Sequence, residues 1–165
     1  MKNATLILNS EKIDRIITRL AYEIYEHYYD SEELIILGIE KYGFNLAKKI
    51  LDQLKIISPI KYQLYSIKLN KKNLPQSKIN FDPKQFSGKE ILIVDDVMNT
   101  GRVLYYTAGL FHNQPVKSVN TLVLINRNHP KFPVFPRFNG MQLSTTLKDH
   151  VEVTKSSKGF KAYLK

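Results

Sequence analysis

Residues 91–103, Ile-Leu-Ile-Val-Asp-Asp-Val-Met-Asn-Thr-Gly-Arg-Val, join an apolar run, two adjacent carboxylates and a turn of small residues. The apolar run at 91–94 is typical of a parallel strand that is covered on both faces. The run predicts a strand that ends at Asp95 and Asp96. Both carboxylates would then lie at the carboxyl edge of a sheet, where ligands bind in open α/β folds.

The turn Asn99-Thr100-Gly101 leads into a stretch from Val103 to Phe111 with apolar residues at helical spacing. Backbone N–H groups at the start of such a helix bind phosphate, and two neighbouring carboxylates suit ribose hydroxyls. The sequence therefore predicts a sugar-phosphate site. The alternative is a strand-to-helix turn whose aspartates only cap the helix.

The rest of the chain alternates predicted helices and strands. Ser10 predicts the N-cap of a long amphipathic helix, and a second helix is predicted after Gly43. Further strands are predicted at 34–37, 62–69, 119–125 and 151–153, and residues 70–88, with two prolines, predict a long loop. This alternation predicts an α/β fold in one domain over residues 1–165, with a mostly parallel central sheet flanked by helices.

The composition of the chain limits the classes of function that it can have. The formal net charge of +10 predicts attraction of polyanions, phosphorylated substrates and nucleic acid alike. The absence of cysteine excludes disulfides, thiolate metal sites and a cysteine nucleophile. The N-terminal apolar run is too short for a signal segment or a membrane span, so we expect a cytoplasmic protein with no membrane partner.

Residues 91–102 resemble the phosphoribosyl-pyrophosphate (PRPP) binding motif of type I phosphoribosyltransferases: apolar residues, two acidic ones, then small residues ending in Thr-Gly. The resemblance implies the type I phosphoribosyltransferase fold, with a lid loop at about 70–88 and a small hood from about 126–150 and the chain ends. It implies transfer of 5-phosphoribosyl from PRPP to a nucleobase with release of pyrophosphate. It also implies Mg²⁺ as cofactor, held mainly by PRPP rather than directly by the protein.

The resemblance also implies roles for individual residues. Asp95 and Asp96 are the expected catalytic carboxylates, which hold the ribose. The other expected site residues are the 5′-phosphate loop Val97, Met98, Asn99, Thr100, Gly101 and Arg102; the pyrophosphate loop Gly38, Ile39, Glu40, Lys41, Tyr42 and Gly43; the lid residues Lys71 and Lys72; and the base-pocket residues Asn126 and Arg127. Several purine-using relatives carry a carboxylate where this chain has Asn99, which favours a pyrimidine here.

Segments 8–11, 18–24, 123–129 and 150–153 are similar to one group of the family, the pyrimidine-operon attenuation regulators that double as uracil phosphoribosyltransferases. This similarity implies uracil as the base, a homodimer or higher homo-oligomer, and RNA as a further partner. The candidate RNA contacts are Thr18, Arg19 and Arg137. Three alternatives stay open: a hypoxanthine/guanine-type purine enzyme, an RNA-binding regulator that uses the pocket as a UMP or PRPP sensor, and a PRPP-binding protein without catalysis.

This chain departs from the pattern of that group at several positions. Lys41-Tyr42 stands where Thr-Arg is usual, Asn126 replaces an Asp, and residues 70–88 contain lysines but no arginine. Because lysine lacks the bidentate fork of arginine, we expect weakened catalysis. Met141 and Leu147 replace basic residues, which predicts weaker RNA binding.

Overall fold

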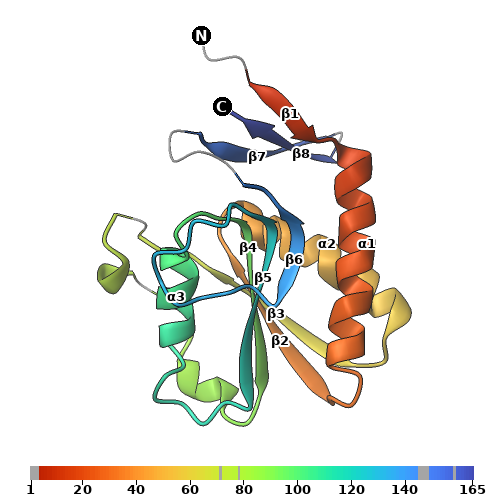
Figure 1. The fold of residues 1–165 in the computed structure, drawn as a ribbon. Coiled ribbons are helices and arrows are strands. Elements are labelled where there is room, and N and C mark those ends of the chain that lie inside the picture. The colour runs from red at the N-terminus through yellow and green to blue at the C-terminus, as the bar shows by residue number, and fades with distance from the viewer. Residues whose placement is uncertain (1–3, 71, 78, 145–148, 158) are drawn as a thin grey trace.

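A computed structural model describes residues 4–70, 72–77, 79–144, 149–157 and 159–165. Its central sheet has five strands, all parallel, in the order β3 (Lys61–Ile67), β2 (Glu33–Ile39), β4 (Glu90–Met98), β5 (Ser118–Asn126) and β6 (Phe138–Gln142). The helices are α1 (Ser10–His27), α2 (Tyr42–Ile57) and α3 (Arg102–Gly109). The predicted mostly parallel sheet with flanking helices is confirmed (Figure 1).

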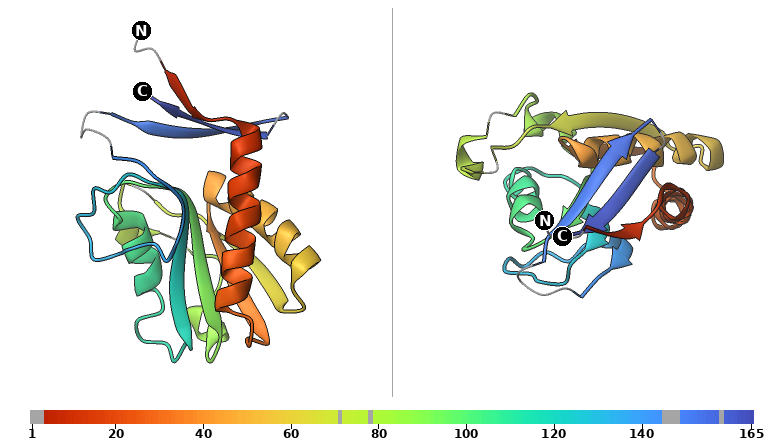
Figure 2. Two further views of the ribbon diagram at one scale, coloured as in Figure 1. Left: turned by 45° about the vertical axis from the view of Figure 1, so that its right-hand side comes forward. Right: turned by 90° about the horizontal axis from the view of Figure 1, so that it is seen from above.

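A smaller antiparallel sheet forms the hood above the central sheet (Figure 1). It contains three strands in the order β1 (Thr5–Leu8), β8 (Gly159–Leu164) and β7 (Val151–Ser156), so it joins the two ends of the chain. Viewed from above, its strands cross over the upper edge of the central sheet (Figure 2). The hood therefore covers the edge where a ligand is expected.

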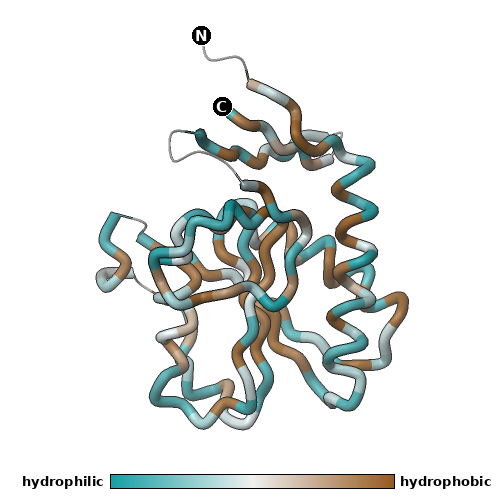
Figure 3. The backbone as a smooth tube through the Cα atoms, in the orientation of Figure 1, coloured by the Kyte–Doolittle hydropathy of each residue, from teal (hydrophilic) through white to brown (hydrophobic). Residues whose placement is uncertain are grey.

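Two hydrophobic clusters lie on opposite faces of the central sheet. Alternate strand residues such as Ile36 and Val94 pack against α1 and α2, and this cluster continues into the hood through Val153 and Phe160. The intervening residues, Ile93 among them, pack on the α3 side. The hydropathy pattern shows the apolar strands at the centre (Figure 3). Helices on both faces explain why these strands read as continuous apolar runs.

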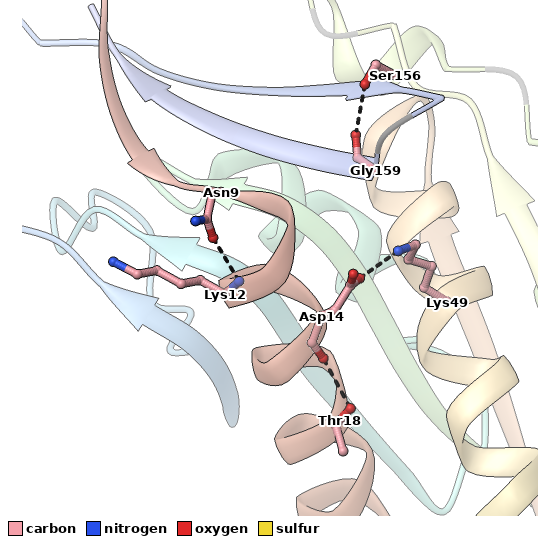
Figure 4. A network of polar contacts seen from close by, with 7 residues as sticks. All are labelled: Asn9, Lys12, Asp14, Thr18, Lys49, Ser156 and Gly159. Atoms are coloured by element: carbon pink, nitrogen blue, oxygen red, sulfur yellow. Dashed lines mark hydrogen bonds and ion pairs between the residues drawn. The ribbon is translucent and has the colours of Figure 1, made fainter.

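The start of α1 differs by one residue from the prediction. Asn9, not Ser10, is the N-cap: its Oδ1 accepts a hydrogen bond from the backbone N of Lys12 at 2.9 Å (Figure 4). Both residue types cap helices, and Asn9 has the extended backbone that a cap requires. Lower on α1, Asp14 pairs with Lys49 of α2 at 2.6 Å and links the two helices (Figure 4).

The other end of α1 is anchored by a buried phenol. Tyr28 follows the helix and its hydroxyl accepts a hydrogen bond from Asn120 of β5 at 2.9 Å. Burial raises the pKa of Tyr28 to about 12, and the hydrogen bond from Asn120 partly opposes this rise. The phenol therefore stays neutral at physiological pH.

Several segments differ from the sequence prediction. Strands β1, β6 and β8 were not predicted, and β6 belongs to the central sheet although its residues lie in the range expected for the hood. The expected lid loop holds two short 3₁₀ helices, Leu74–Gln76 and Pro83–Phe86. Phe86 is buried against the rings of Tyr65, Phe81 and Phe111, so the second half of that segment packs on the core.

Close packing of α2 against β2 depends on a glycine. A Cβ on Gly38 would lie 2.5 Å from the Cα of Phe44, whereas a Cβ on Gly109 at the end of α3 meets nothing within 4 Å. We predict that Gly38→Ala lowers the free energy of unfolding by about 1–3 kcal/mol, since backbone must shift. The matched Gly109→Ala control should stay within about 1 kcal/mol of the wild type. Urea unfolding measures both, and equal stabilities of the two variants would contradict this packing argument.

Candidate active site

The site opens where two parallel strands part. β2 and β4 are paired up to Gly38 and Val94, and beyond this point β4 continues to pair with β5 as far as Met98 and Asn126. From here α2 leads toward β3 on one side, and α3 leads toward β5 on the other. Such a switch point in the strand order leaves a crevice at the carboxyl edge of the sheet.

Asp95 and Asp96 stand at the edge of this crevice, but within β4 rather than after it. The prediction that the strand ends at these residues is wrong, because pairing with β5 continues for three more residues on one side only. Asp95 is buried, 5% exposed, and its Oδ1 accepts a hydrogen bond from the backbone N of Asp96 at 2.9 Å. Asp96 is partly exposed and faces the same cavity.

The first turn of α2 lies directly against these carboxylates. A Cβ on Gly43 would be 2.7 Å from the carbonyl O of Val94 and 2.9 Å from the Cα of Asp95. Only a glycine allows this approach. The packing fixes β4 at Val94 and Asp95 and brings Tyr42, the first residue of α2, to the cavity wall.

The expected 5′-phosphate loop divides into two parts. Val97 and Met98 are strand residues, while Asn99, Thr100 and Gly101 form the turn before α3. Gly101 is the N-cap with φ of +80°, a conformation that favours glycine. The carbonyl O of Thr100 accepts hydrogen bonds from the N–H groups of Lys131 and Phe132 at 2.9 and 3.2 Å, which hold the turn in place.

A cavity of about 340 Å³ collects these parts. Its walls come from Tyr42, from the continuous stretch 95–104 and from the hood residues 150–153. The start of α3 therefore shares one cavity with both aspartates, as the motif predicts. Helix N-termini of this kind bind phosphate groups.

The hood residues are the part of the wall that sequence reasoning missed. His150 and Glu152 line the cavity, although residues 150–153 were noted only for their resemblance and were given no role. The ammonium of Lys165 donates a hydrogen bond to the Glu152 carboxyl and lowers its pKa. No local signal predicts this, because the hood sheet that places Glu152 joins the two ends of the chain.

The expected pyrophosphate loop is shorter than predicted. Gly38 and Ile39 belong to β2, and Tyr42 and Gly43 belong to α2, so the turn itself is Glu40-Lys41, which are joined by a cis peptide. A second hollow, about 530 Å³, is lined by Glu40, Lys41, Lys68, Leu69, Asn70 and Lys72. Lys72, one of the two expected lid residues, therefore lines the same hollow as the Glu40-Lys41 turn. Lys71 lies outside the described residues.

The two expected base-pocket residues have different contacts. Asn126 ends β5, and its Oδ1 accepts a hydrogen bond from the backbone N of Asn128 at 2.9 Å. Arg127 is buried and donates to the side-chain Oδ1 of Asn99 at 2.6 Å. The lining of the main cavity, as far as the structure describes it, includes Asn99 but neither Asn126 nor Arg127.

The three RNA candidates lie along α1 and near β6. Thr18 donates to the carbonyl O of Asp14 at 3.1 Å, and Arg19 donates to the carbonyl O of Gly140 at 2.7 Å and pairs with Glu23 at 2.5 Å. Arg137 is exposed and lines a groove with Glu23, Glu26, His27, Asn120, Phe135, Pro136 and Phe138. Both arginines are exposed, and the guanidinium of Arg19 already has hydrogen-bond partners within the molecule.

The donor set of the main cavity suits Mg²⁺ bound together with a phosphorylated substrate. Within the described part of the chain, no group of three or more His, Asp or Glu residues is placed to hold a metal ion. Mg²⁺ is commonly bound by one or two carboxylates plus substrate phosphates, and Asp95 and Asp96 offer such carboxylates. None of the described helices has the length and apolar character to cross a membrane.

Comparison with known proteins agrees with this geometry. The phosphoribosyl transferase domain family matches residues 3–153. The chain belongs to the phosphoribosyltransferase family. The enzyme class predicted from the motif is therefore confirmed, and the family uses PRPP and a nucleobase as substrates.

Two bifunctional relatives are similar to this chain over most of its length. The chain is 32% identical to the Bifunctional protein PyrR of Brevibacillus brevis, over 93% of this chain and 90% of the relative. It is also 32% identical to the Bifunctional protein PyrR of Microcystis aeruginosa, over 89% and 88%. The resemblance noted from the sequence is thus confirmed.

Solved structures confirm the type I fold. The hypoxanthine phosphoribosyltransferase of Trypanosoma cruzi superposes with a TM-score of 0.78 at 14% identity, covering 96% of this chain and 95% of that one. A hypoxanthine-guanine phosphoribosyltransferase from Bacillus anthracis gives 0.76 at 14% identity, covering 98% and 99%. At this identity the likeness establishes the fold alone.

The contact of Gly43 with Val94 and Asp95 of β4 gives a test of the site. We predict that Gly43→Ala raises the KM for PRPP about tenfold or more, because the added methyl displaces Asp95 by several tenths of an ångström. The Gly109→Ala variant, which adds the same methyl in open space, should keep the wild-type KM. Steady-state kinetics at varied PRPP measures both. An unchanged KM in Gly43→Ala would show that Asp95 does not depend on this packing.

Proposed function

We propose that the protein transfers the 5-phosphoribosyl group of PRPP to uracil and releases UMP and pyrophosphate. The observation that carries the proposal is the single cavity in which Asp95 and Asp96 lie beside the glycine-capped start of α3. This arrangement matches the chemistry of a ribose that carries a 5′-phosphate. The hood residues form the opposite wall of the cavity, which limits access of competing water.

The shared cavity supports the following roles. The bond from C1 of the ribose to the pyrophosphate oxygen breaks, and a bond from C1 to a base nitrogen forms. Asp95 and Asp96 hold the ribose hydroxyls, and the turn 99–101 with the first amides of α3 holds the 5′-phosphate. Lys41, Lys68 and Lys72 surround the hollow beside it and would stabilise the leaving pyrophosphate. Mg²⁺, when bound with PRPP, neutralises part of the same charge.

Uracil is the proposed base for two reasons. Asn99 cannot titrate, so it cannot serve as the carboxylate that several purine-using relatives carry at this position. The chain is 32% identical to the Brevibacillus brevis relative over 93% of its length, whereas the Trypanosoma cruzi hypoxanthine enzyme shares 14% identity over 96% of it. A purine of the hypoxanthine or guanine type is the second candidate.

The first experiment is PRPP-dependent pyrophosphate release with Mg²⁺, in which uracil, hypoxanthine, guanine, xanthine and adenine are compared. We predict turnover with uracil and a loss on the order of 10²–10³-fold in kcat/KM in Asp95→Asn/Asp96→Asn, because ribose contacts formed in the transition state are weakened. Asp52→Asn, the same change at an exposed position of α2, is the matched control. Turnover with a purine and not with uracil would transfer the proposal to the second candidate.

RNA binding by a regulator of pyrimidine genes is a second proposed function. The groove with Arg137 supports it: the arginine is exposed, and the neighbouring Phe135 is 77% exposed and available for stacking on a base. The groove also contains Glu23 and Glu26, which oppose a polyanion. We therefore propose modest affinity, with a homo-oligomer in the cytoplasm as the binding form.

Salt dependence tests this second function. We predict that Arg137→Ala weakens binding to the leader RNA of a pyrimidine operon and lowers the slope of log K against log salt by about 1, since one phosphate contact is lost. Arg15→Ala is the control, because Arg15 is exposed on α1 and pairs with Glu11. Filter binding at several salt concentrations measures both slopes. Binding that is insensitive to both salt and uridine nucleotides would contradict the regulator hypothesis.

A further inference from the structure

Arg127 is one of two buried charged residues in the part of the chain that the structure describes. Of the Asp, Glu, Lys and Arg residues that the structure describes, only Asp95 and Arg127 are buried, at 5% and 7% exposed. Burial of a guanidinium is unfavourable unless its N–H groups are hydrogen-bonded. The partners of Arg127 therefore indicate what its burial achieves.

The guanidinium of Arg127 joins two separate parts of the cavity wall. Its Nη1 donates to Oδ1 of Asn99 in the phosphate turn at 2.6 Å, and its Nη2 donates to the carbonyl O of Asp149 at 2.7 Å. Asp149 immediately precedes the hood residues 150–153 that line the cavity. The two hydrogen bonds hold the phosphate turn and the entry to the hood at a fixed separation.

The backbone of Arg127 is fixed as well. The residue follows β5 directly, and its N–H donates to the carbonyl O of Met98 at 3.0 Å, one residue before Asn99. The guanidinium thus extends from a rigid strand end, which makes it an effective anchor for the two loops. Charge-assisted hydrogen bonds of this kind are roughly twice as strong as neutral ones.

The hydrogen bond from Arg127 also determines which end of the Asn99 amide faces the cavity. An amide whose oxygen accepts from a guanidinium directs its NH₂ group away from that partner. Asn99 lines the cavity, so it presents hydrogen-bond donors to a ligand there. Donors suit the oxygens of a phosphate and cannot accept a proton from a base.

We infer that Arg127 is a positioning residue for the PRPP site, which orients the amide of Asn99 toward the 5′-phosphate and ties the phosphate turn to the hood at Asp149. The inference rests on the proposed function for the identity of the ligand. It assigns Arg127 a task different from direct contact with the base. It also explains why a guanidinium is buried beside a cavity whose wall it does not form.

Hydrogen exchange of the ligand-free protein tests the anchoring directly. We predict that Arg127→Ala accelerates exchange about tenfold to a hundredfold in residues 99–104 and 149–153, because the hydrogen bonds that restrain both segments are lost. Exchange in β2 and the middle of α1 should stay at the wild-type rate. Arg15→Ala, the same change at an exposed arginine of α1, is the control. Faster exchange throughout the molecule, or in neither segment, would overturn the inference.

Kinetics tests the consequence for the ligand. We predict that Arg127→Ala raises the KM for PRPP about tenfold to a hundredfold with kcat within about threefold, and that millimolar guanidinium partly restores KM. Asn99→Asp keeps an oxygen for Arg127 but removes the donors, so exchange should stay at the wild-type rate while the KM rises. The loss in Arg127→Ala/Asn99→Ala should be smaller than the sum of the two single losses, because both single variants remove the orientation of the Asn99 amide. Additive losses would overturn the inference.

The two proposals fail in different ways. If the wild type turns over no base, the dissociation constant of PRPP from calorimetry replaces KM, and the same changes are expected. If the wild type binds no PRPP, the proposed function fails. The exchange experiment then still decides whether Arg127 ties the two segments together.

Discussion

The parting of β2 and β4 after Gly38 and Val94 is the constraint on which the rest of the structure depends. The first turn of α2 packs closely against β2 and β4 there, and this packing depends on Gly38 and Gly43: an added methyl group would meet backbone at 2.5 Å and 2.7 Å, respectively. Every later feature of the site uses this opening. The aspartates line it, the start of α3 faces it, and the hood closes it from above.

The opening alone would be a polar crevice filled with water. Contacts between distant segments convert it into a defined site: the segment at 131–132 holds the carbonyl of Thr100, and Arg127 holds the side chain of Asn99. The hood, a sheet that joins the two ends of the chain, supplies the opposite wall through residues 150–153. Preorganised groups of this kind lower the reorganisation needed when a charged substrate reacts.

The sequence predicted those parts of the fold that depend on local patterns. Residues 91–94 alternate between two clusters and therefore read as a buried strand, and Gly101 marks the turn because only a left-handed backbone joins β4 to α3 there. Features that depend on distant partners were not predictable. Pairing with β5 alone extends β4 past Asp95 to Met98, and the short strand β6 forms only against β5. The direction of the Arg127 side chain likewise depends on Asn99 and Asp149, which are far from it in the sequence.

Whether the protein acts mainly as an enzyme or as a nucleotide sensor depends on which half of the PRPP site departs from the family pattern. In the proposed function, the ribose and its 5′-phosphate are bound by the aspartates, the turn and the start of α3, and these parts match the family motif. In the same proposal, expulsion of pyrophosphate uses the Glu40-Lys41 turn and the lid. The usual arginine of the turn is replaced here by Tyr42, and the lid contains lysines but no arginine. A lysine neutralises charge but cannot grip a phosphate with two parallel hydrogen bonds, so leaving-group stabilisation suffers more than ground-state binding. Such a site would hold PRPP or UMP well and turn over slowly, which is the combination that a nucleotide-responsive regulator requires.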